Sequence, residues 1–256
     1  MAQVISVSNQ KGGVGKTTTA VNLSAALAAG EKTCLLIDCD PQGNATTGLG
    51  VDIAGLSLGL YDLLMGTASL EDTVTETELP HLHLLGATRE LIGAEVEMVS
   101  MASKEFLLRK IVSELRTRYD YIFIDCPPSL GFLTINALTA SASVLVPLQC
   151  EYYALEGLSK LLTTVKAIKK RLNPVLRRVD ILLTMYDKRN NLSRQVEEEA
   201  RALFKERVLK TVIPRNVRLS EAPSYGKPII LYDIRSQGAQ SYLSLAREMI
   251  EREKAP

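Results

Sequence analysis

The feature that most constrains the fold is a glycine-rich loop that joins an apolar segment to a helix-like segment. The loop spans residues 10–18 and reads QKGGVGKTT, between an apolar run at 4–8 and an alanine- and leucine-rich run at 20–27. Its three glycines can adopt backbone angles closed to other residues, so successive N–H groups can turn inward and form a nest for an anion. Strand, glycine loop and helix in this order are the P-loop arrangement, which holds a polyphosphate at the positive end of the helix dipole.

The P-loop arrangement assigns a role to the polar side chains of the loop. Lys16 is expected to reach the β- and γ-phosphates of a nucleotide, and the Thr17 hydroxyl is expected to ligate Mg²⁺. The predicted nucleotide-binding residues of the loop are Lys11, Gly12, Gly13, Val14, Gly15, Lys16, Thr17 and Thr18.

Three aspartates follow buried strands that the sequence predicts downstream of the loop. Asp38 and Asp40 come after one apolar run, and Asp125 ends another. Ligands of doubly wound sheets bind at the carboxyl ends of parallel strands. We therefore expect Asp125 to hold Mg²⁺ through water opposite Thr17, and Asp38 to order the water shell of the metal. The alternative is that these carboxylates only cap turns.

Strand-like and helix-like segments alternate along the chain, which predicts an α/β fold: a doubly wound, mostly parallel sheet with helices on both faces. No repeat or linker divides the 256 residues, so we expect a single P-loop domain over 1–256. Residues 45–80 are expected to be peripheral, and the proline-rich, polar stretch 212–224 is expected to be a functional loop. The expected strands lie at 4–8, 33–38, 82–85, 121–125, 143–147 and 179–185, and the later helices at 89–101, 104–119, 192–206 and 237–253, with a further long helix that ends near 172.

Composition narrows the partners and the compartment. The formal net charge is +1, so a nucleic-acid or membrane partner has to be inferred from local clusters of charge. The four cysteines show no C-x-x-C spacing, and no apolar run approaches the roughly 18 residues that cross a bilayer. With a first strand that begins almost at Met1, these features predict a cytoplasmic protein with reduced, buried thiols. One basic cluster is either a nucleic-acid surface or a solvated face: Lys166, Lys169, Lys170, Arg171, Arg177 and Arg178.

Five motifs together resemble the Soj branch of the ParA partition ATPases, within the ParA/MinD superfamily. They occur in that family's order, and the resemblance runs from about residue 3 to the last helix. Gln10 stands where the general P-loop pattern has its first glycine, and Lys11 matches the extra lysine of the deviant Walker A motif. The motifs are KGGVGKT at 11–17, DPQGN at 40–44, IDCPPS at 124–129, QCEYYALEG at 149–157 and PRNVRLSEAP at 214–223.

The resemblance implies an ATP-dependent switch that partitions chromosomes or plasmids. It implies ATP and Mg²⁺ as cofactors, a homodimer with two nucleotides between its subunits, and slow ATP hydrolysis that a ParB-type centromere-binding protein stimulates. It further implies that the dimer binds double-stranded DNA without sequence preference. The expected location is therefore cytoplasmic and nucleoid-associated, with no membrane partner.

Matching positions carry the family's residue roles onto this chain. Lys11 would cross the dimer interface to the partner's nucleotide, and with Lys16 and Asp40 it forms the expected catalytic set, in which Asp40 positions the hydrolytic water. Pro214 and Asn216 would line the adenine pocket.

Two arginines match positions that the family uses on DNA, namely Arg189 and Arg218. Each of them has the alternative of being a solvated surface charge. The neighbouring basic residues expected to assist them are Lys188, Arg215, Lys227 and Arg235.

Three other functions are to be weighed against partition. A MinD-like ATPase would bind membrane through a C-terminal amphipathic helix, but the segment at 244–254 mixes acidic with basic residues and is typical of a packed helix. A nitrogenase-iron-protein-like reductase would hold an iron–sulfur cluster between subunits, for which Cys126 and Cys150 are available. A small-molecule P-loop kinase would transfer phosphate rapidly to an acceptor.

Overall fold

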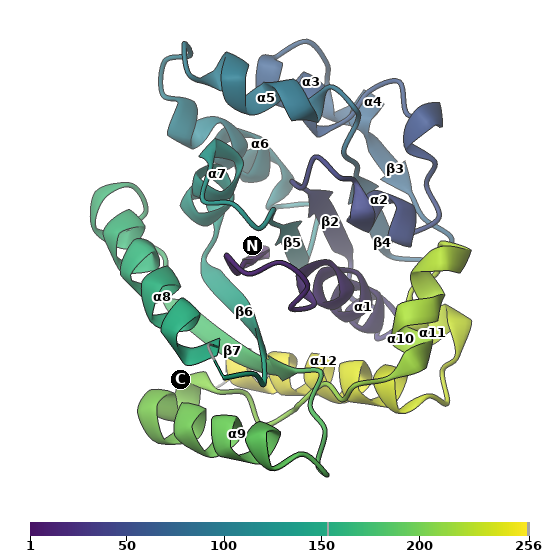
Figure 1. Ribbon diagram of the computed structural model, residues 1–256. Helices are drawn as coiled ribbons and strands as arrows, with labels where there is room; N and C mark the ends of the chain where they lie inside the picture. Colours follow the sequence, from purple (N-terminus) through teal and green to yellow (C-terminus); the bar gives the residue numbers. More distant parts are fainter. Residues whose placement is uncertain (153, 255–256) are drawn as a thin grey trace.

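A seven-stranded sheet forms the centre of the structure, a computed structural model that describes residues 1–152 and 154–254 (Figure 1). The strand order is β3-β4-β2-β5-β1-β6-β7, and every neighbouring pair is parallel except β3 with β4. This confirms the doubly wound, mostly parallel fold that the alternating segments predict. Tyr153, in the motif at 149–157, lies outside the described residues. The strands are β1 (Gln3–Val7), β2 (Cys34–Asp38), β3 (Val74–Glu76), β4 (Leu82–Leu85), β5 (Tyr121–Asp125), β6 (Ser143–Gln149) and β7 (Arg178–Thr184).

Helices cover both faces of this sheet. In Figure 1, α12 crosses the lower part of the view beneath α1, and α5, α6 and α7 occupy the upper part. The helices are α1 (Lys16–Ala28), α2 (Asn44–Gly48), α3 (Leu60–Met65), α4 (Leu70–Thr73), α5 (Leu91–Met98), α6 (Leu107–Leu115), α7 (Phe132–Ala140), α8 (Ala154–Arg171), α9 (Asn191–Phe204), α10 (Val217–Glu221), α11 (Ile229–Tyr232) and α12 (Gln237–Lys254), and the 3₁₀ turns are η1 (Ile53–Gly55), η2 (Lys104–Phe106), η3 (Lys205–Arg207) and η4 (Ala222–Tyr225).

Successive residues of the central strands serve opposite faces of the sheet, because side chains alternate along a strand. In β5, Tyr121 and Phe123 join a core formed with α1 and α12, whereas Ile122 and Ile124 join a second core formed with α6 and α7. A third core lies between β6, β7, α8 and α9. Burial on both faces explains why the sequence shows these strands as continuous apolar runs.

Three parts of the chain differ from the sequence expectations. The sequence patterns predict no element at α7; this helix is buried on most sides, so no one-sided apolar stripe marks it. Residues 212–224 are not simply a loop, because the Asn216 side chain accepts a hydrogen bond of 3.3 Å from the Leu219 N–H and so caps α10. Residues 45–80 are not wholly peripheral either. They contribute Thr46 and Thr47 to the candidate site, together with the short antiparallel strand β3.

The C-terminal helix α12 packs against the body of the protein. Tyr242, Leu245 and Met249 are buried in the core that includes α1, and the Tyr242 hydroxyl lies 3.2 Å from the Thr19 hydroxyl. The protein itself therefore covers the apolar face that a MinD-like tail would insert into lipid. Among the described residues, no helix combines the length and the apolar character needed to span a bilayer.

Candidate nucleotide site

The glycine loop between β1 and α1 has the backbone of an anion-binding nest. Gly13 has a φ of +73° and Gly15 a φ of +89°, angles that favour glycine, and Gly15 directly precedes the first residue of α1. A Cβ atom added at Gly12 or Gly13 would meet no atom within 4 Å, so the loop faces open space. The loop thus leaves room for a phosphate group at the N-terminus of α1.

Lys16 begins α1 and lies inside the loop rather than in solvent. The residue is 7% exposed, and its Nζ donates a hydrogen bond of 3.1 Å to the carbonyl oxygen of Lys11. Burial lowers the pKa of Lys16, whereas the negative charges of Asp125 and Asp40 raise it. A polyphosphate in the nest would supply the anion that a buried ammonium needs.

Asp125 is a buried carboxylate with almost no hydrogen-bonding partner among the described residues. It ends β5, it is 0% exposed, and neither of its side-chain oxygens makes a well-formed hydrogen bond there, although the nearby Thr17 hydroxyl favours its charged form. Burial, and next the neighbouring Asp38, raise the pKa of Asp125 well above its usual range. Carboxylate and hydroxyl oxygens are the ligands that Mg²⁺ prefers, so the unpartnered Asp125 and the nearby Thr17 fit a divalent cation.

Asp38 stands beside Asp125 but is held by its own turn. The two aspartates are register partners on the parallel strands β2 and β5. One oxygen of Asp38 accepts hydrogen bonds of 2.8 Å from both the N–H and the hydroxyl of Thr46, and the other accepts one of 3.1 Å from the Asp40 N–H. Burial raises the pKa of Asp38 to about 6, although these hydrogen bonds oppose the shift. Asp38 therefore shapes the turn that carries Asp40, a role that is compatible with ordering water around a metal.

The raised pKa values predict that Mg²⁺ binding weakens in acid. Below about pH 6 a proton occupies Asp38. Asp125 also holds its proton more tightly than an exposed carboxyl does, so the cation has to displace protons in order to bind. We expect Mg²⁺ affinity in the presence of ADP to rise by up to about tenfold per pH unit between pH 5 and pH 7. Mg²⁺ titrations that follow a fluorescent ADP analogue measure this dependence. Asp125→Asn is the control, because it removes one of the two titrating carboxyls and should show a weaker pH dependence, which comes from Asp38 and the nucleotide. An equal pH dependence in the two proteins would contradict the assignment.

Two adjoining cavities extend from the loop. The first, of about 500 Å³, is lined by Asp40, Gln42 and Thr47 and by every loop residue from Gly12 to Thr18 except the buried Val14. The second, of about 470 Å³, is lined by Pro214 and Asn216, the two residues predicted to line the adenine pocket. Both cavities are lined by Gly15, Thr18, Met185 and Pro223, so they lie next to each other. A nucleotide-sized ligand can lie across them with its phosphates at the loop.

Two residues at the carboxyl end of β7 also shape this site, although no sequence motif marks them. The Thr184 hydroxyl donates a hydrogen bond of 2.9 Å to the Val14 carbonyl oxygen and so ties the loop to the sheet. The next residue, Met185, has a φ of +50° and lines both cavities. Their place at the carboxyl end of a parallel strand was the available signal.

Lys11 and four of the six predicted DNA-binding residues do not line either cavity. The Lys11 side chain is 48% exposed and forms an ion pair with Glu151. Arg189 pairs with Asp187 at 3.0 Å, and Arg218 pairs with Glu221 at 2.9 Å. Of the remaining candidates, Lys188 and Arg235 are exposed, Arg215 lines the second cavity, and Lys227 lines the first and pairs with Glu78. The six DNA candidates come from four segments of the chain, at 188–189, 215–218, 227 and 235.

The cysteines behave as packed thiols. All four are free and buried, as expected, and the Cys126 thiol donates to the Ile124 carbonyl oxygen at a distance of 3.7 Å. Burial raises the pKa of Cys126 above its ordinary range. Because Cys126 is 0% exposed within its own chain, its sulfur does not reach a surface at which a second subunit could share a cluster.

The fold, the glycine nest, Lys16 and the strand-end aspartates define a P-loop nucleotide-binding protein with a second lysine in its loop. The family model described as an AAA domain matches residues 2–178. The sporulation initiation inhibitor protein Soj of Bacillus subtilis is 57% identical over 97% of this chain and 98% of its own length. The chromosome partitioning protein ParA of Myxococcus xanthus is 54% identical over 99% of this chain and 89% of its own. The chain belongs to the ParA/Soj family of partitioning ATPases.

A solved structure shares the fold of this chain. It is that of cobyrinic acid a,c-diamide synthase from Mycobacterium smegmatis with bound ADP and magnesium, which matches with a TM-score of 0.87 at 35% identity. The match covers 100% of this chain and 96% of that one.

Proposed function

We propose that this partitioning ATPase is a switch in which ATP and Mg²⁺ close two copies of the chain around two nucleotides, the dimer holds DNA, and hydrolysis releases it. The observation that carries the dimer is the position of Lys11. This lysine belongs to the P-loop, yet it does not line the cavities of its own chain, and its ammonium faces Glu151. It is therefore available to a nucleotide bound by a second copy.

Each residue of the nucleotide site has a role in this proposal. Lys16 and the N–H groups of Gly12 to Thr18 hold the phosphates, Thr17 and Asp125 hold Mg²⁺, and Asp38 orders its surroundings. Bound Mg²⁺ would neutralise charge on the β- and γ-phosphates. Support comes from the unpartnered oxygens of Asp125 and from the related synthase, which was crystallised with ADP and magnesium. We treat residues 1–256 as one domain, since all seven strands share a sheet.

Asp40 is the residue that we propose positions the hydrolytic water. It is 8% exposed and lines the same cavity as Lys16 and Thr17. Its Oδ1 accepts a hydrogen bond of 3.0 Å from the Gln42 N–H, which fixes the orientation of the carboxylate. The relatives' names support partition as the outcome of turnover. We propose that a ParB-type protein stimulates this turnover.

Arg189 and Arg218 are proposed to contact DNA phosphates, which places the ATP-bound protein on the nucleoid. Their side chains are 90% and 54% exposed, and each is paired with an acidic neighbour. Exposed ion pairs of this kind contribute little to stability, so exchanging a carboxylate for a phosphate costs little. A few such contacts give weak, salt-sensitive binding, and a dimer multiplies it through effective concentration.

The variant Lys11→Ala tests the dimer. We expect nucleotide affinity to change by less than about threefold, because Lys11 lies outside the cavity of its own chain. The ATP-dependent increase in mass measured by light scattering should disappear, because the second copy's nucleotide loses its cation.

Lys110→Ala, which removes an exposed lysine of α6, is the matched control and should dimerise normally. A Lys11→Ala protein that still doubles its mass with ATP would refute the crossing role. A protein that loses nucleotide affinity instead would place Lys11 in its own site.

A further inference from the structure

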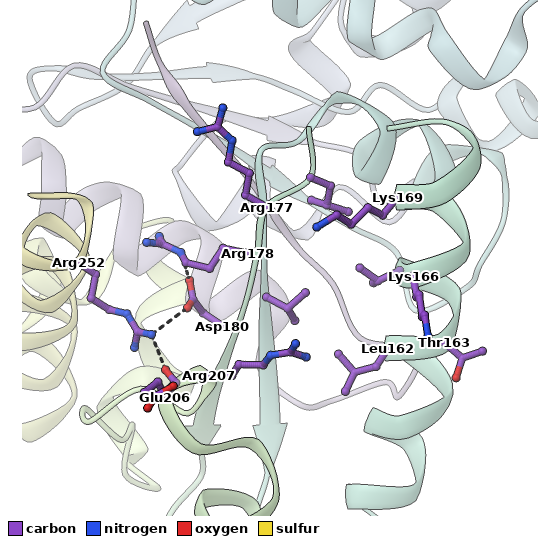
Figure 2. A pocket seen from close by; sticks show the side chains of 13 residues that line it. Leu162, Thr163, Lys166, Lys169, Arg177, Arg178, Asp180, Glu206, Arg207 and Arg252 are labelled. Atoms are coloured by element: carbon purple, nitrogen blue, oxygen red, sulfur yellow. Dashed lines mark hydrogen bonds and ion pairs between the residues drawn. The ribbon is translucent and has the colours of Figure 1, made fainter. Parts of the chain in front are cut away.

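A basic cavity lies beside the amino end of β7, whereas the nucleotide site lies at the carboxyl ends of the strands. It has a volume of about 700 Å³ and lies between α8, the start of β7, η3 and the end of α12 (Figure 2). Arg178 begins β7 at this cavity, and Thr184 ends the strand at the P-loop. Six residues of strand separate the two by about 20 Å, so a nucleotide in the P-loop does not fill this cavity.

Six of the residues that line the cavity are cationic and two are anionic. Arg178 Nε lies 2.7 Å from one oxygen of the buried Asp180, and Arg252 lies 3.5 Å from the other, so Asp180 serves these two arginines. The other four cations have no ion-pair partner within 4 Å among the described residues: Lys166, Lys169, Arg177 and Arg207.

Helix capping explains only part of this charge. Lys169 lies in the last turn of α8, where a cation favours the negative end of the helix dipole. Arg177 precedes β7 and Arg207 belongs to η3, so neither serves that helix. Figure 2 shows Arg207 extending toward α8 and Lys169 extending from α8 toward β7. Like charges from separate elements therefore converge on one recess, an arrangement that repels itself unless an anion occupies it.

We propose that this cavity binds a small, multiply phosphorylated molecule. The volume is within the range of small-molecule sites, and Leu162, Val165, Leu176 and Val179 supply an apolar wall for an organic body. Arg207 and Lys169 supply donors for phosphate oxygens from two sides. A recess with inward-facing cations suits a compact anion better than a duplex, which needs cations that project outward to its backbone.

Calorimetry with inorganic tripolyphosphate tests the site. The P-loop is first saturated with ADP in excess Mg²⁺, so that only a second site can respond. We expect one saturable site per chain with a dissociation constant below about 1 mM, weakening with salt. The double variant Lys169→Ala, Arg207→Ala should bind tripolyphosphate at least about tenfold more weakly, because each substitution removes a charge-assisted contact. Both residues are exposed, so the fold should be unaffected.

Lys170→Ala is the matched control, because Lys170 is exposed on the same helix but does not line the cavity; it should bind tripolyphosphate like the unmodified protein. Absence of saturable heat, or equal affinity in the double variant, would overturn the proposal. Displacement of the probe by a 20-base-pair duplex in the ADP state would overturn it in favour of a DNA surface. None of these results bears on the P-loop, so the proposed partition function is tested separately.

Discussion

Lys16→Ala is expected to remove nucleotide binding almost entirely. The ammonium is buried in the loop, 3.1 Å from the Lys11 carbonyl oxygen. Lys227, the other lysine among the described residues that lines this cavity, lies outside the loop. Loss of a cation that makes several charge-assisted hydrogen bonds to phosphate costs about 3–5 kcal/mol, or at least about a hundredfold in affinity. Equilibrium binding of a fluorescent ATP analogue measures the change.

Lys110→Ala is again the control for loss of a lysine without loss of the site. Lys16 also holds the loop through its hydrogen bond to Lys11, so the substitution could disturb the fold. Circular dichroism distinguishes unfolding from a loss of binding alone. A folded Lys16→Ala protein that binds ATP with nearly normal affinity would contradict the phosphate role.

Asp40→Ala is expected to bind ATP and dimerise but to turn over at least about a hundredfold more slowly, which is the usual contribution of a group that positions or activates water. The dimer should therefore persist in ATP instead of dissociating. Steady-state release of phosphate, with light scattering in parallel, measures both effects.

Asp40→Asn refines this test. Its side-chain oxygen can still accept the hydrogen bond from the Gln42 N–H, so the turn should be preserved while the negative charge is lost. The proposal predicts slow turnover in both variants. If Asp40→Asn turns over normally and Asp40→Ala does not, Asp40 acts by shaping its turn. Normal turnover in both would contradict any role in hydrolysis.

The local parts of the site could be predicted because their chemistry is contiguous in the sequence. The loop from Lys11 to Thr18 needs only its glycines and the helix that follows, and the aspartates at 38 and 125 follow directly from apolar strands. Parallel strands then bring both aspartates to one edge, as the register of β2 and β5 confirms.

Contacts between distant segments could not be predicted in this way. Thr184 supports the loop from 170 residues away, and the Asp38–Thr46 hydrogen bonds depend on how α2 returns to the sheet. The helix α7 could not be predicted because it is buried on nearly all sides, so no one-sided apolar stripe marks the helical period. The Lys11–Glu151 pair likewise joins two segments that are adjacent only in the fold.

The basic residues that line the cavity also could not be predicted from the sequence alone. The sequence groups Lys166 to Arg178 as one cluster, but the cavity takes Arg207 and Arg252 from later segments and leaves Lys170 and Arg171 aside. Charge along a chain therefore indicates where an anion can bind, and the fold decides which charges share a recess.

Retention of duplex DNA in each nucleotide state tests the central claim most directly. The protein would be passed over immobilised DNA with no nucleotide, with ADP, or with a non-hydrolysable ATP analogue, each with Mg²⁺. The proposal predicts retention only with the analogue, and its loss in Arg218→Glu but not in Arg109→Glu, a charge reversal on the exposed face of α6. Equal retention without nucleotide, or none with the analogue, would contradict the switch.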